Sequence, residues 1–268
     1  TVIFEVLKLA GADNTKAADF EAIVSKDQAL TAKMLKMVNS AFYSIPKKIT
    51  TIRDAVVVLG FKTLRSIVMA AATTKLFRHD SVGYGFERAG LWKHSYGAAV
   101  VARFLSVKLG WSQEAADGAF VGGLLHDMGK LILEKYLALH QEAFHAKLIQ
   151  EPGRMAELEQ EFIGYDHVAL GKEIAMKWKL PQSIVEMISC HHAPAAFGPL
   201  QPQGALIHLA NFMARSAGWG IARGFTARTP LVAGSLEILG LSPADLPPIQ
   251  QEAAAQQVLV RLQRDRAG

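Results

Sequence analysis

The chain has 268 residues and lacks several features that would each indicate a particular class of protein. Its single cysteine, Cys190, excludes an intrachain disulfide, which fits a reducing compartment. No stretch approaches the roughly 20 uninterrupted apolar residues that a membrane-spanning helix needs. The N-terminal residues contain neither the basic region nor the small-residue cleavage site of a secretory signal. These absences predict a cytoplasmic protein that does not cross a membrane.

A strong charge imbalance is also missing. The formal net charge is +5, and the longest local cluster of basic residues is Lys47 and Lys48. Lysine and arginine can neutralise phosphate, so a nucleic-acid partner is one interpretation of this charge. Because the basic residues are spread over many segments, an ordinary solvated surface explains them better, and we expect no nucleic-acid partner.

The chain has no initiator methionine, and its first residues already carry a helical pattern. Phe4 and Leu7 fall on one side of an amphipathic helix. We therefore expect a piece of a longer polypeptide, with a further domain or segment before it.

Hydrophobic residues make up half of the chain and recur at spacings of three and four. This period is typical of helices that face a core, and no convincing period of two appears, so the sequence predicts an all-α fold. Leu30, Met34 and Val38 form one such stripe, which Leu35 and Phe42 extend. A further helix begins near Thr51, a capping residue, and ends at Gly60.

The segment 79–85 is polar and contains glycine, and it predicts a hinge between two lobes. We expect an N-terminal helical lobe over residues 1–85 and a second helical lobe over 86–268, which together form one unit. In the second lobe the periodicity predicts helices over 87–109, 115–136, 155–162, 167–178, 182–192 and 204–217. The helix 115–136 contains three glycines, which indicate close packing or a crowded site.

Chemistry-bearing side chains gather after the hinge. His126 and Asp127 supply an imidazole nitrogen and a carboxylate oxygen, which are ligand types of divalent metal ions. Lys130 stands on nearly the same helix face as His126 and could stabilise a phosphate oxygen or pair with Asp127. The competing interpretation is a buried, hydrogen-bonded pair of His126 and Asp127 that holds helices together without an ion. Further histidines that could join the site are His94, His167, His191, His192 and His208.

Several ordered motifs resemble the HDOD family, a relative of the HD-type phosphohydrolases. The N-terminal segment LTAKMLKMVNSAFYS is similar to the helical region that distinguishes HDOD proteins from ordinary HD phosphohydrolases. The resemblance covers roughly residues 1–215. The other motifs that carry it are Trp92-Lys93-His94-Ser95, GLLHDMGK at 123–130, DHVALG at 166–171, WKLP at 178–181 and the pair His191-His192.

The resemblance implies an HD-superfamily helical bundle with an additional N-terminal lobe. It also implies a bacterial signalling output module without an established general enzymatic activity, acting on signalling proteins or a fused domain. The related HD-GYP phosphodiesterases hydrolyse cyclic di-GMP at a two-metal site, and Lys130 falls on a lysine of that site. The positions that match metal ligands there are His94, His126, Asp127, His167, His191 and His192.

The sequence departs from the HD-GYP pattern at three places. Asn211 stands where HD domains have a last aspartate ligand, and a neutral carbonyl binds a divalent cation more weakly than a carboxylate does. Ala193 and Pro194 stand where that pattern has a glutamate and later a Gly-Tyr-Pro loop. Gly90 leaves empty a place where some relatives have a ligand. These departures argue against hydrolytic activity.

Two functions are therefore predicted as alternatives. The first is a regulatory module that acts through protein contacts and keeps at most a vestigial metal site. The second is a metal-dependent phosphohydrolase of a nucleotide or cyclic dinucleotide, with iron, manganese or magnesium as its ion. His167 could instead face solvent in a first helical turn, and His191 or His192 could serve only to complement a helix C-terminus. Cys190 is expected to be structural.

Overall fold

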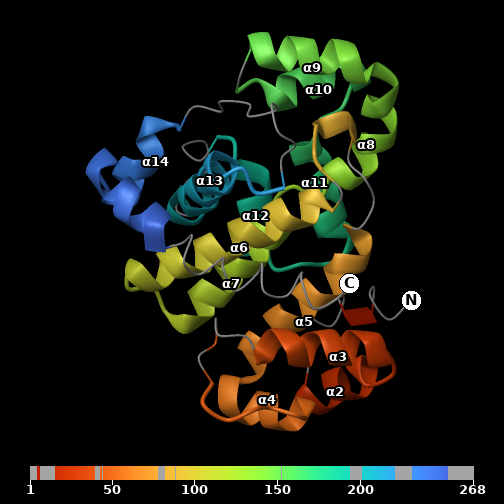
Figure 1. Cartoon of the computed structure of the whole chain (residues 1–268), viewed down its shortest axis with the longest axis vertical. Coiled ribbons are helices and arrows are strands. Elements are labelled where there is room, and N and C mark those ends of the chain that lie inside the picture. The colour runs from red at the N-terminus through yellow and green to blue at the C-terminus, as the bar shows by residue number, and fades with distance from the viewer. Residues whose placement is uncertain are drawn as a thin grey trace.

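The computed structural model describes residues 5–6, 16–39, 43, 45–77, 82–87, 89–151, 153–193, 201–220 and 231–252. Regular secondary structure in these segments is helical, and they contain no β-strand. The predicted all-α class is confirmed. Figure 1 shows the short N-terminal helices at one end and a larger group of helices around α6 and α7 at the other.

The N-terminal helices are α2 (Ala17–Val24), α3 (Gln28–Val38), α4 (Ile52–Leu59) and α5 (Phe61–Leu76). As the spacing predicts, Leu30, Met34 and Val38 are buried on one face of α3, and Leu35 packs against the core more loosely. Phe42, also expected in this stripe, lies outside the described residues.

Local signals at the ends of α4 act as predicted. The Thr51 side chain accepts a hydrogen bond from the Asp54 amide at 3.0 Å, and so caps the N-terminus. Gly60 closes the helix with a φ of +78°, a conformation that glycine adopts without the steric cost of a side chain. The chain can then turn at once into α5.

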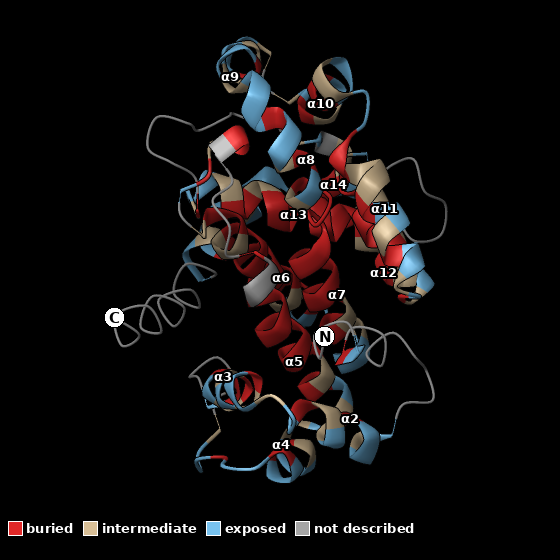
Figure 2. Ribbon diagram, turned by 90° about the vertical axis from the view of Figure 1, so that its right-hand side faces the viewer, coloured by how far each residue is buried: buried red, intermediate tan, exposed pale blue. Residues whose placement is uncertain are grey.

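The centre of the larger group is α6 (Gly90–Lys108) packed along α7 (Gln113–Leu125), with α13 (Gln201–Ser216) against α6. Most of α6 is buried, as Figure 2 shows for both central helices. A helix that is buried nearly all round belongs to the middle of a bundle. Beside it, α12 (Gln182–Cys190) packs against α7 and α11 (His167–Lys177).

The remaining helices extend this group. At the upper end in Figure 1 lie α8 (Lys130–Leu137), α9 (Gln141–Gln150) and α10 (Met155–Ile163), with the short 3-10 helices η2 (Val82–Tyr84) and η3 (Ala138–His140) packed beside α8. The helix α14 (Ala233–Ile238) packs on α13, and η6 (Pro243–Asp245) follows it.

A buried carboxylate connects α5 to the central pair of helices. Asp117 on α7 accepts hydrogen bonds from the Thr63 hydroxyl at 2.8 Å, the Arg103 guanidinium at 3.2 Å and the Gln113 amide at 3.0 Å. The Arg103 guanidinium also lies 5.6 Å from the Tyr43 ring centre. We call these residues the Asp117 cluster. The division of the chain into lobes at residue 85 stays a prediction.

One predicted helix is wrong in its extent. The periodicity predicts a single helix over 115–136, but α7 ends at Leu125 and α8 begins at Lys130. The His126 ring bonds to the Gly123 carbonyl oxygen at 2.7 Å, which helps to end α7. A Cβ on Gly129 would lie 2.1 Å from the His167 carbonyl oxygen, so α11 approaches the intervening turn very closely. His126 and Asp127 therefore stand in a turn.

The glycines of this segment have the role that the sequence indicated. A Cβ on Gly122 would lie 2.3 Å from the Met187 sulfur, and one on Gly123 would lie 2.8 Å from the Ala99 Cα. Close packing of α6, α7 and α12 therefore requires small residues here. The helix predicted over 87–109 begins later, at Gly90, after Ala89 in a left-handed conformation with φ of 54°.

Candidate metal centre

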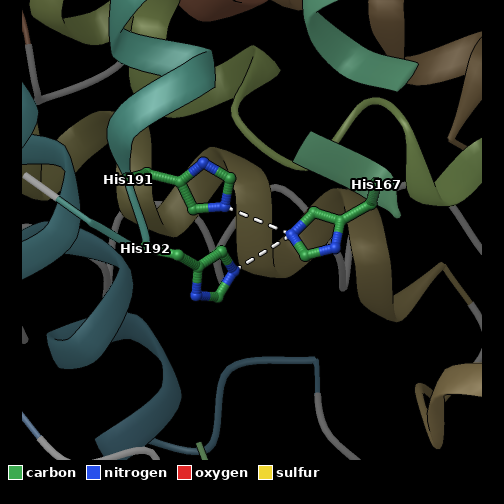
Figure 3. A group of neighbouring side chains, drawn as sticks. All are labelled: His167, His191 and His192. Carbon is green, nitrogen blue, oxygen red and sulfur yellow. Dashed lines mark hydrogen bonds between the residues drawn. The ribbon is translucent and has the colours of Figure 1, made fainter. Parts of the chain in front are cut away.

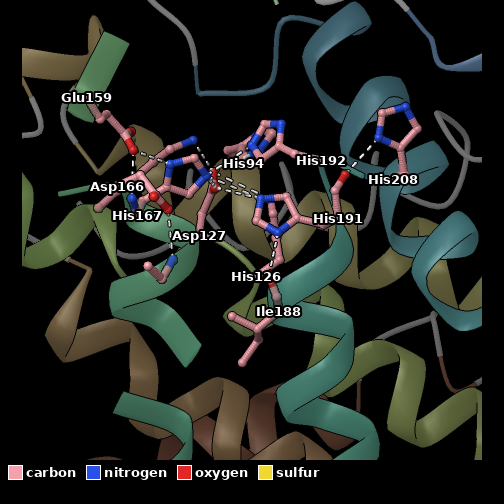
Figure 4. Close-up of polar contacts among 12 residues, drawn as sticks. His94, His126, Asp127, Glu159, Asp166, His167, Ile188, His191, His192 and His208 are labelled. Atoms are coloured by element: carbon pink, nitrogen blue, oxygen red, sulfur yellow. Dashed lines mark hydrogen bonds and ion pairs between the residues drawn. The ribbon is translucent and has the colours of Figure 1, made fainter. Parts of the chain in front are cut away.

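The carboxylate of Asp127 lies in the middle of a ring of histidines that come from several helices (Figure 4). Its Oδ2 is 3.5 Å from Nε2 of His94 on α6 and 3.4 Å from Nε2 of His126. Its Oδ1 is 3.5 Å from Nε2 of His167, which begins α11, and 3.7 Å from Nε2 of His191, which follows α12. All five side chains are inaccessible to solvent.

These side chains form two groups, each compact enough to surround one ion. His94, His126 and Asp127 make the first group, which we call the HD group. His167, His191 and His192 make the second, which we call the histidine triad. Figure 3 shows Nε2 of His167 turned toward Nε2 of His191 at 3.3 Å and toward Nε2 of His192 at 3.0 Å. Asp127 lies between the two groups.

Backbone carbonyls fix the ring protons of two histidines. Nδ1 of His126 is 2.7 Å from the Gly123 carbonyl oxygen, and Nδ1 of His191 is 2.7 Å from the Ile188 carbonyl oxygen. A carbonyl oxygen can only accept, so Nδ1 carries the proton in both rings. In the neutral ring Nε2 is then an unprotonated nitrogen whose lone pair faces the centre.

Glu159 on α10 sets the third ring, and the sequence analysis missed it. Its Oε2 accepts from the His167 backbone amide and from His167 Nδ1, both at 2.6 Å, and the residue is fully buried. In the neutral tautomer that this bond selects, Nε2 of His167 carries a lone pair. A signal was present, because Glu159 shares the buried face of α10 with Met155 and Leu158. A glutamate in an apolar helix face needs a partner.

Lys130 supplies the nearest positive charge. It is fully buried, and its Nζ donates to Asp127 Oδ2 at 2.8 Å. The ammonium group also lies 5.5 Å from the Tyr84 ring centre and 6.0 Å from that of Phe86, within range of a cation–π interaction. The sequence left two roles open for Lys130, and the structure shows the pairing with Asp127.

Burial favours the neutral form of three of the histidines. Burial holds the pKa of His94, His191 and His192 well below the ordinary value, although Asp127 opposes the shift. Burial acts to raise the pKa of Asp127, but His126 and Lys130 outweigh it and hold that pKa well below its usual range. A carboxylate with neutral imidazoles around it is the protonation state that metal ligands need.

The arrangement fits a divalent cation better than it fits hydrogen bonding. Nε2 of His167 and Nε2 of His191 are both bare, so no proton is available for the contact between them. Among the described residues, Nε2 of His126, both ring nitrogens of His94 and Oδ1 of Asp127 have no hydrogen-bond partner. Two ligand atoms each about 2.1 Å from one ion stand about 3.0–3.4 Å apart at tetrahedral or octahedral angles. The nitrogen pairs of the histidine triad have this spacing.

The helix α13 passes beside the centre. His208 donates from Nδ1 to the His191 carbonyl oxygen at 2.7 Å and accepts at Nε2 from the Val232 amide, so it is held away from the ring of ligands. Asn211 is buried, and its Oδ1 has no partner among the described residues. Arg215, which the sequence analysis also missed, adds a positive charge that acts on Asp127 and His94.

Three other expectations concern the edges of the site. A Cβ on Gly90 would lie 2.1 Å from the Gly220 carbonyl oxygen, so backbone fills the place of a missing ligand. The Cys190 thiol donates to the Glu186 carbonyl oxygen, and burial raises its pKa to about 11. This thiol therefore has a structural role, as expected. Ala193 follows the histidine triad, and Pro194 lies outside the described residues.

A helical bundle with adjacent histidine and aspartate ligand types at its centre defines a protein of the HD superfamily. The HDOD domain family matches residues 1–194, and the chain belongs to this family. Among the described residues, no helix has both the length and the apolar character that a membrane span requires. The recognition of the family and the fold class predicted from it are thereby confirmed.

Solved structures of similar fold support this assignment. A candidate phosphohydrolase from Shewanella amazonensis is 25% identical, with 96% of this chain and 90% of that chain covered and a TM-score of 0.73. An HDOD domain protein of unknown function from Geobacter sulfurreducens is 23% identical, with 98% and 87% covered and a TM-score of 0.67.

A longer protein shares part of its sequence with this chain. An uncharacterised protein of Treponema pallidum is 25% identical over 209 residues, which are 74% of this chain. The match spans only 38% of that relative.

Proposed function

We propose that this chain is a signal-transduction module of the HDOD family that binds a divalent metal ion at the Asp127 centre and acts through contacts with other proteins. The observation that carries the metal site is the set of bare Nε2 atoms of His126, His167 and His191 around one carboxylate. Without a cation, these lone pairs face each other and the carboxylate in a buried place, which is unfavourable.

The HD group and the histidine triad would hold the ion, with Asp127 shared between them. Imidazole-rich sites suit iron or manganese better than magnesium, which prefers oxygen ligands. A bound ion supplies a concentrated positive charge and Lewis acidity at this point. The chain's own residues do the positioning, because Glu159 and two backbone carbonyls fix the rings before any ion arrives.

Burial and ligand identity favour a regulatory role over catalysis. His94, His126, Asp127, His167 and His191 are fully buried, which restricts the approach of a substrate. Asn211 and Gly90 provide no carboxylate. The ligands come from α6, the turn after α7, α11 and the end of α12, so an ion would fix these four elements relative to one another. Signalling partners would then meet one of two states of the same fold.

A metal-dependent phosphohydrolase of a nucleotide or cyclic dinucleotide is the second candidate. One observation favours it: the two donor groups share the Asp127 carboxylate, as a pair of ions acting on a phosphoester would need. The similarity to the candidate phosphohydrolase of Shewanella amazonensis points the same way. In this function Lys130 would have to release Asp127 before it could bind a phosphate.

Metal analysis tests the proposal directly. We expect the purified protein to retain stoichiometric metal, and His126→Ala or His167→Ala to lose it. His140→Ala is the matched control, because His140 is exposed and belongs to neither group. A wild-type protein that holds no metal and gains no thermal stability from added Mn²⁺ or Fe²⁺ overturns the metal site.

Activity separates the two candidates. The loaded protein is incubated with cyclic di-GMP and with a chromogenic phosphodiester. Turnover that His126→Ala abolishes and His140→Ala preserves would establish the phosphohydrolase. Loaded protein without turnover, together with a partner interaction that His126→Ala weakens, supports the regulatory module.

A further inference from the structure

One face of α13 is directed at the metal centre. His208, Asn211 and Arg215 follow at spacings of three and four, so they share one face of the helix. The hydrogen bond from His208 to the His191 carbonyl oxygen at 2.7 Å holds this face against the end of α12, where the histidine triad begins. The next two turns therefore bring Asn211 and Arg215 past the centre, along α6.

Both residues carry polar atoms without partners. Asn211 is 4% exposed and its Oδ1, an acceptor that suits the metal ion, is unbonded; the Nε of Arg215, a donor that suits an anion, is buried and unbonded. Among the described residues, the Arg215 side chain has no hydrogen bond or ion pair, although its backbone carbonyl accepts from the Gly218 amide. A buried guanidinium N–H without an acceptor is unfavourable. Burial accordingly lowers the pKa of Arg215, although Asp127 opposes the shift.

The charges of the centre leave room for a negative ligand. Asp127, Glu159 and Asp166 contribute three carboxylates, and Lys130 and Arg215 contribute two cations. These charges leave the site with one negative charge before any metal is bound. A divalent ion then gives the site a net positive charge, since Asn211 adds no carboxylate. An anion would restore the balance.

Solvent exposure also indicates that a ligand would enter beside α13. Among the candidate ligands, His192 is the one that is not fully buried, and Arg215 is also partly exposed. The HD group and the rest of the histidine triad are closed to solvent. A ligand arriving from water meets His192 and Arg215 before it meets Asp127.

We propose that Arg215 and Asn211 form a binding site for an oxyanion, such as a phosphoryl group, between α13 and the histidine triad. This inference rests on the proposed metal site. The guanidinium donates two parallel hydrogen bonds to an oxyanion, and the Asn211 amide can donate a third. The ligand would bridge the ion and α13, and so report an anionic signal to the fold.

Calorimetric titration with inorganic phosphate tests the site on metal-loaded protein, with acetate in a parallel titration. Arg215→Gln is expected to weaken phosphate binding by about tenfold or more, because charge-assisted hydrogen bonds are lost. Arg215→Lys keeps the charge without the fork and is expected to fall between. Arg154→Gln is the matched control, because Arg154 is exposed and pairs with Glu151 and Glu161.

Asn211→Asp provides a second test, because it should change the metal affinity and the phosphate affinity in opposite directions. The new carboxylate is expected to tighten metal binding and, by repulsion, to weaken phosphate binding. This variant keeps the proposal testable if Arg215→Gln does not fold. Equal phosphate affinity in wild type, Arg215→Gln and Asn211→Asp, at equal metal content, overturns the oxyanion site while leaving the metal site intact.

Two further outcomes identify the ligand and separate the oxyanion site from the metal site. Preference for phosphate over acetate assigns a phosphoryl ligand, and equal affinities that both fall in Arg215→Gln support the oxyanion site with a carboxylate ligand. A wild-type protein without metal overturns the proposed function. In that case the same variants are compared in metal-free protein, where weaker phosphate binding by Arg215→Gln supports the anion site and equal binding overturns it.

Discussion

Two buried aspartates, one within α7 and one just after it, have opposite surroundings. Asp117 accepts from Thr63, Arg103 and Gln113 at 2.8–3.2 Å. Asp127 has one donor, Lys130, and otherwise faces imidazole nitrogens at 3.4–3.7 Å. Both carboxylates are shielded from water, but only the first has its hydrogen-bond acceptors matched by protein donors.

The difference shows how one residue type serves two purposes. A buried carboxylate is tolerated when donors or a cation compensate for its lost hydration. At Asp117 the protein itself provides the donors, so the cluster is complete in the folded chain. At Asp127 neighbouring imidazole nitrogens face the carboxylate, so the proposed metal ion would complete the cluster. The first aspartate is part of the scaffold, and we propose that the second is a metal ligand.

The largest expected effect is on the scaffold. Asp117→Ala should lower the unfolding free energy by about 3 kcal/mol or more, because Thr63, Arg103 and Gln113 lose the acceptor that they share. The loss should be the same with and without Mn²⁺ in urea denaturation. Glu114→Ala removes only an exposed pair with Lys62 and should leave stability nearly unchanged. A loss confined to metal-free protein would contradict the assignment of Asp117 to the scaffold.

The second effect separates the two aspartates by metal dependence. Mn²⁺ at about 100 times its dissociation constant should stabilise the wild type by about 2.7 kcal/mol. Asp127→Asn should abolish this gain. Asp117→Asn should keep the gain, although its stability without Mn²⁺ should be lower than that of the wild type. Thermal unfolding with and without Mn²⁺ measures both. If both variants keep the gain, Asp127 is not a ligand.

A smaller effect concerns the support of the ligands. Glu159→Gln should weaken metal binding by about 10- to 100-fold, because an amide holds the His167 proton less firmly than a carboxylate does. Metal-competition titration provides the dissociation constant. Glu157→Gln is the control, since Glu157 is exposed on the same helix. Unchanged affinity in Glu159→Gln would show that Glu159 only fastens α10 to α11.

The smallest effect is a pH dependence of the metal-free protein. The pKa values of His94, His191 and His192 lie below the ordinary 6.5 in the folded state. Below that pH the unfolded chain binds protons that the folded chain does not, so the unfolding free energy should fall as the pH drops from 7 to 5. Asp117→Asn should show the same slope. A flat profile would mean that these rings are not buried in neutral form.

Residue type and order predicted the candidate ligands, but not their support. His94, His126, Asp127, His167 and the pair after α12 stand out because histidine is rare and these positions follow recognisable motifs. Local chemistry is equally readable: the Thr51 cap of α4 was predicted from residue type, and Asp166 caps α11 in the same way by accepting from the Ala169 amide at 2.8 Å. Such signals need only the sequence neighbours of a residue.

Packing between distant helices decided what the sequence left hidden. Glu159 and Arg215 are residue types that usually lie on the surface, and the position of Glu159 on an apolar helix face predicts burial but not its partner His167. The break before Lys130 is also invisible to periodicity, which continues through it. Only the approach of the His167 carbonyl to Gly129 requires the turn. The roles of Glu159, Arg215 and the turn follow only from contacts between helices that are far apart in the sequence.

The turn that carries Asp127 has a consequence for how the centre is assembled. The HD group comes from α6 and the end of α7, which are neighbours in the chain and pack along one another. The histidine triad comes from α11 and the end of α12, which follow later in the chain and reach Asp127 only by packing against this turn. The residues of the HD group are therefore synthesised before those of the triad. An ion captured there would wait for the triad, and Asp127 would take part in both stages.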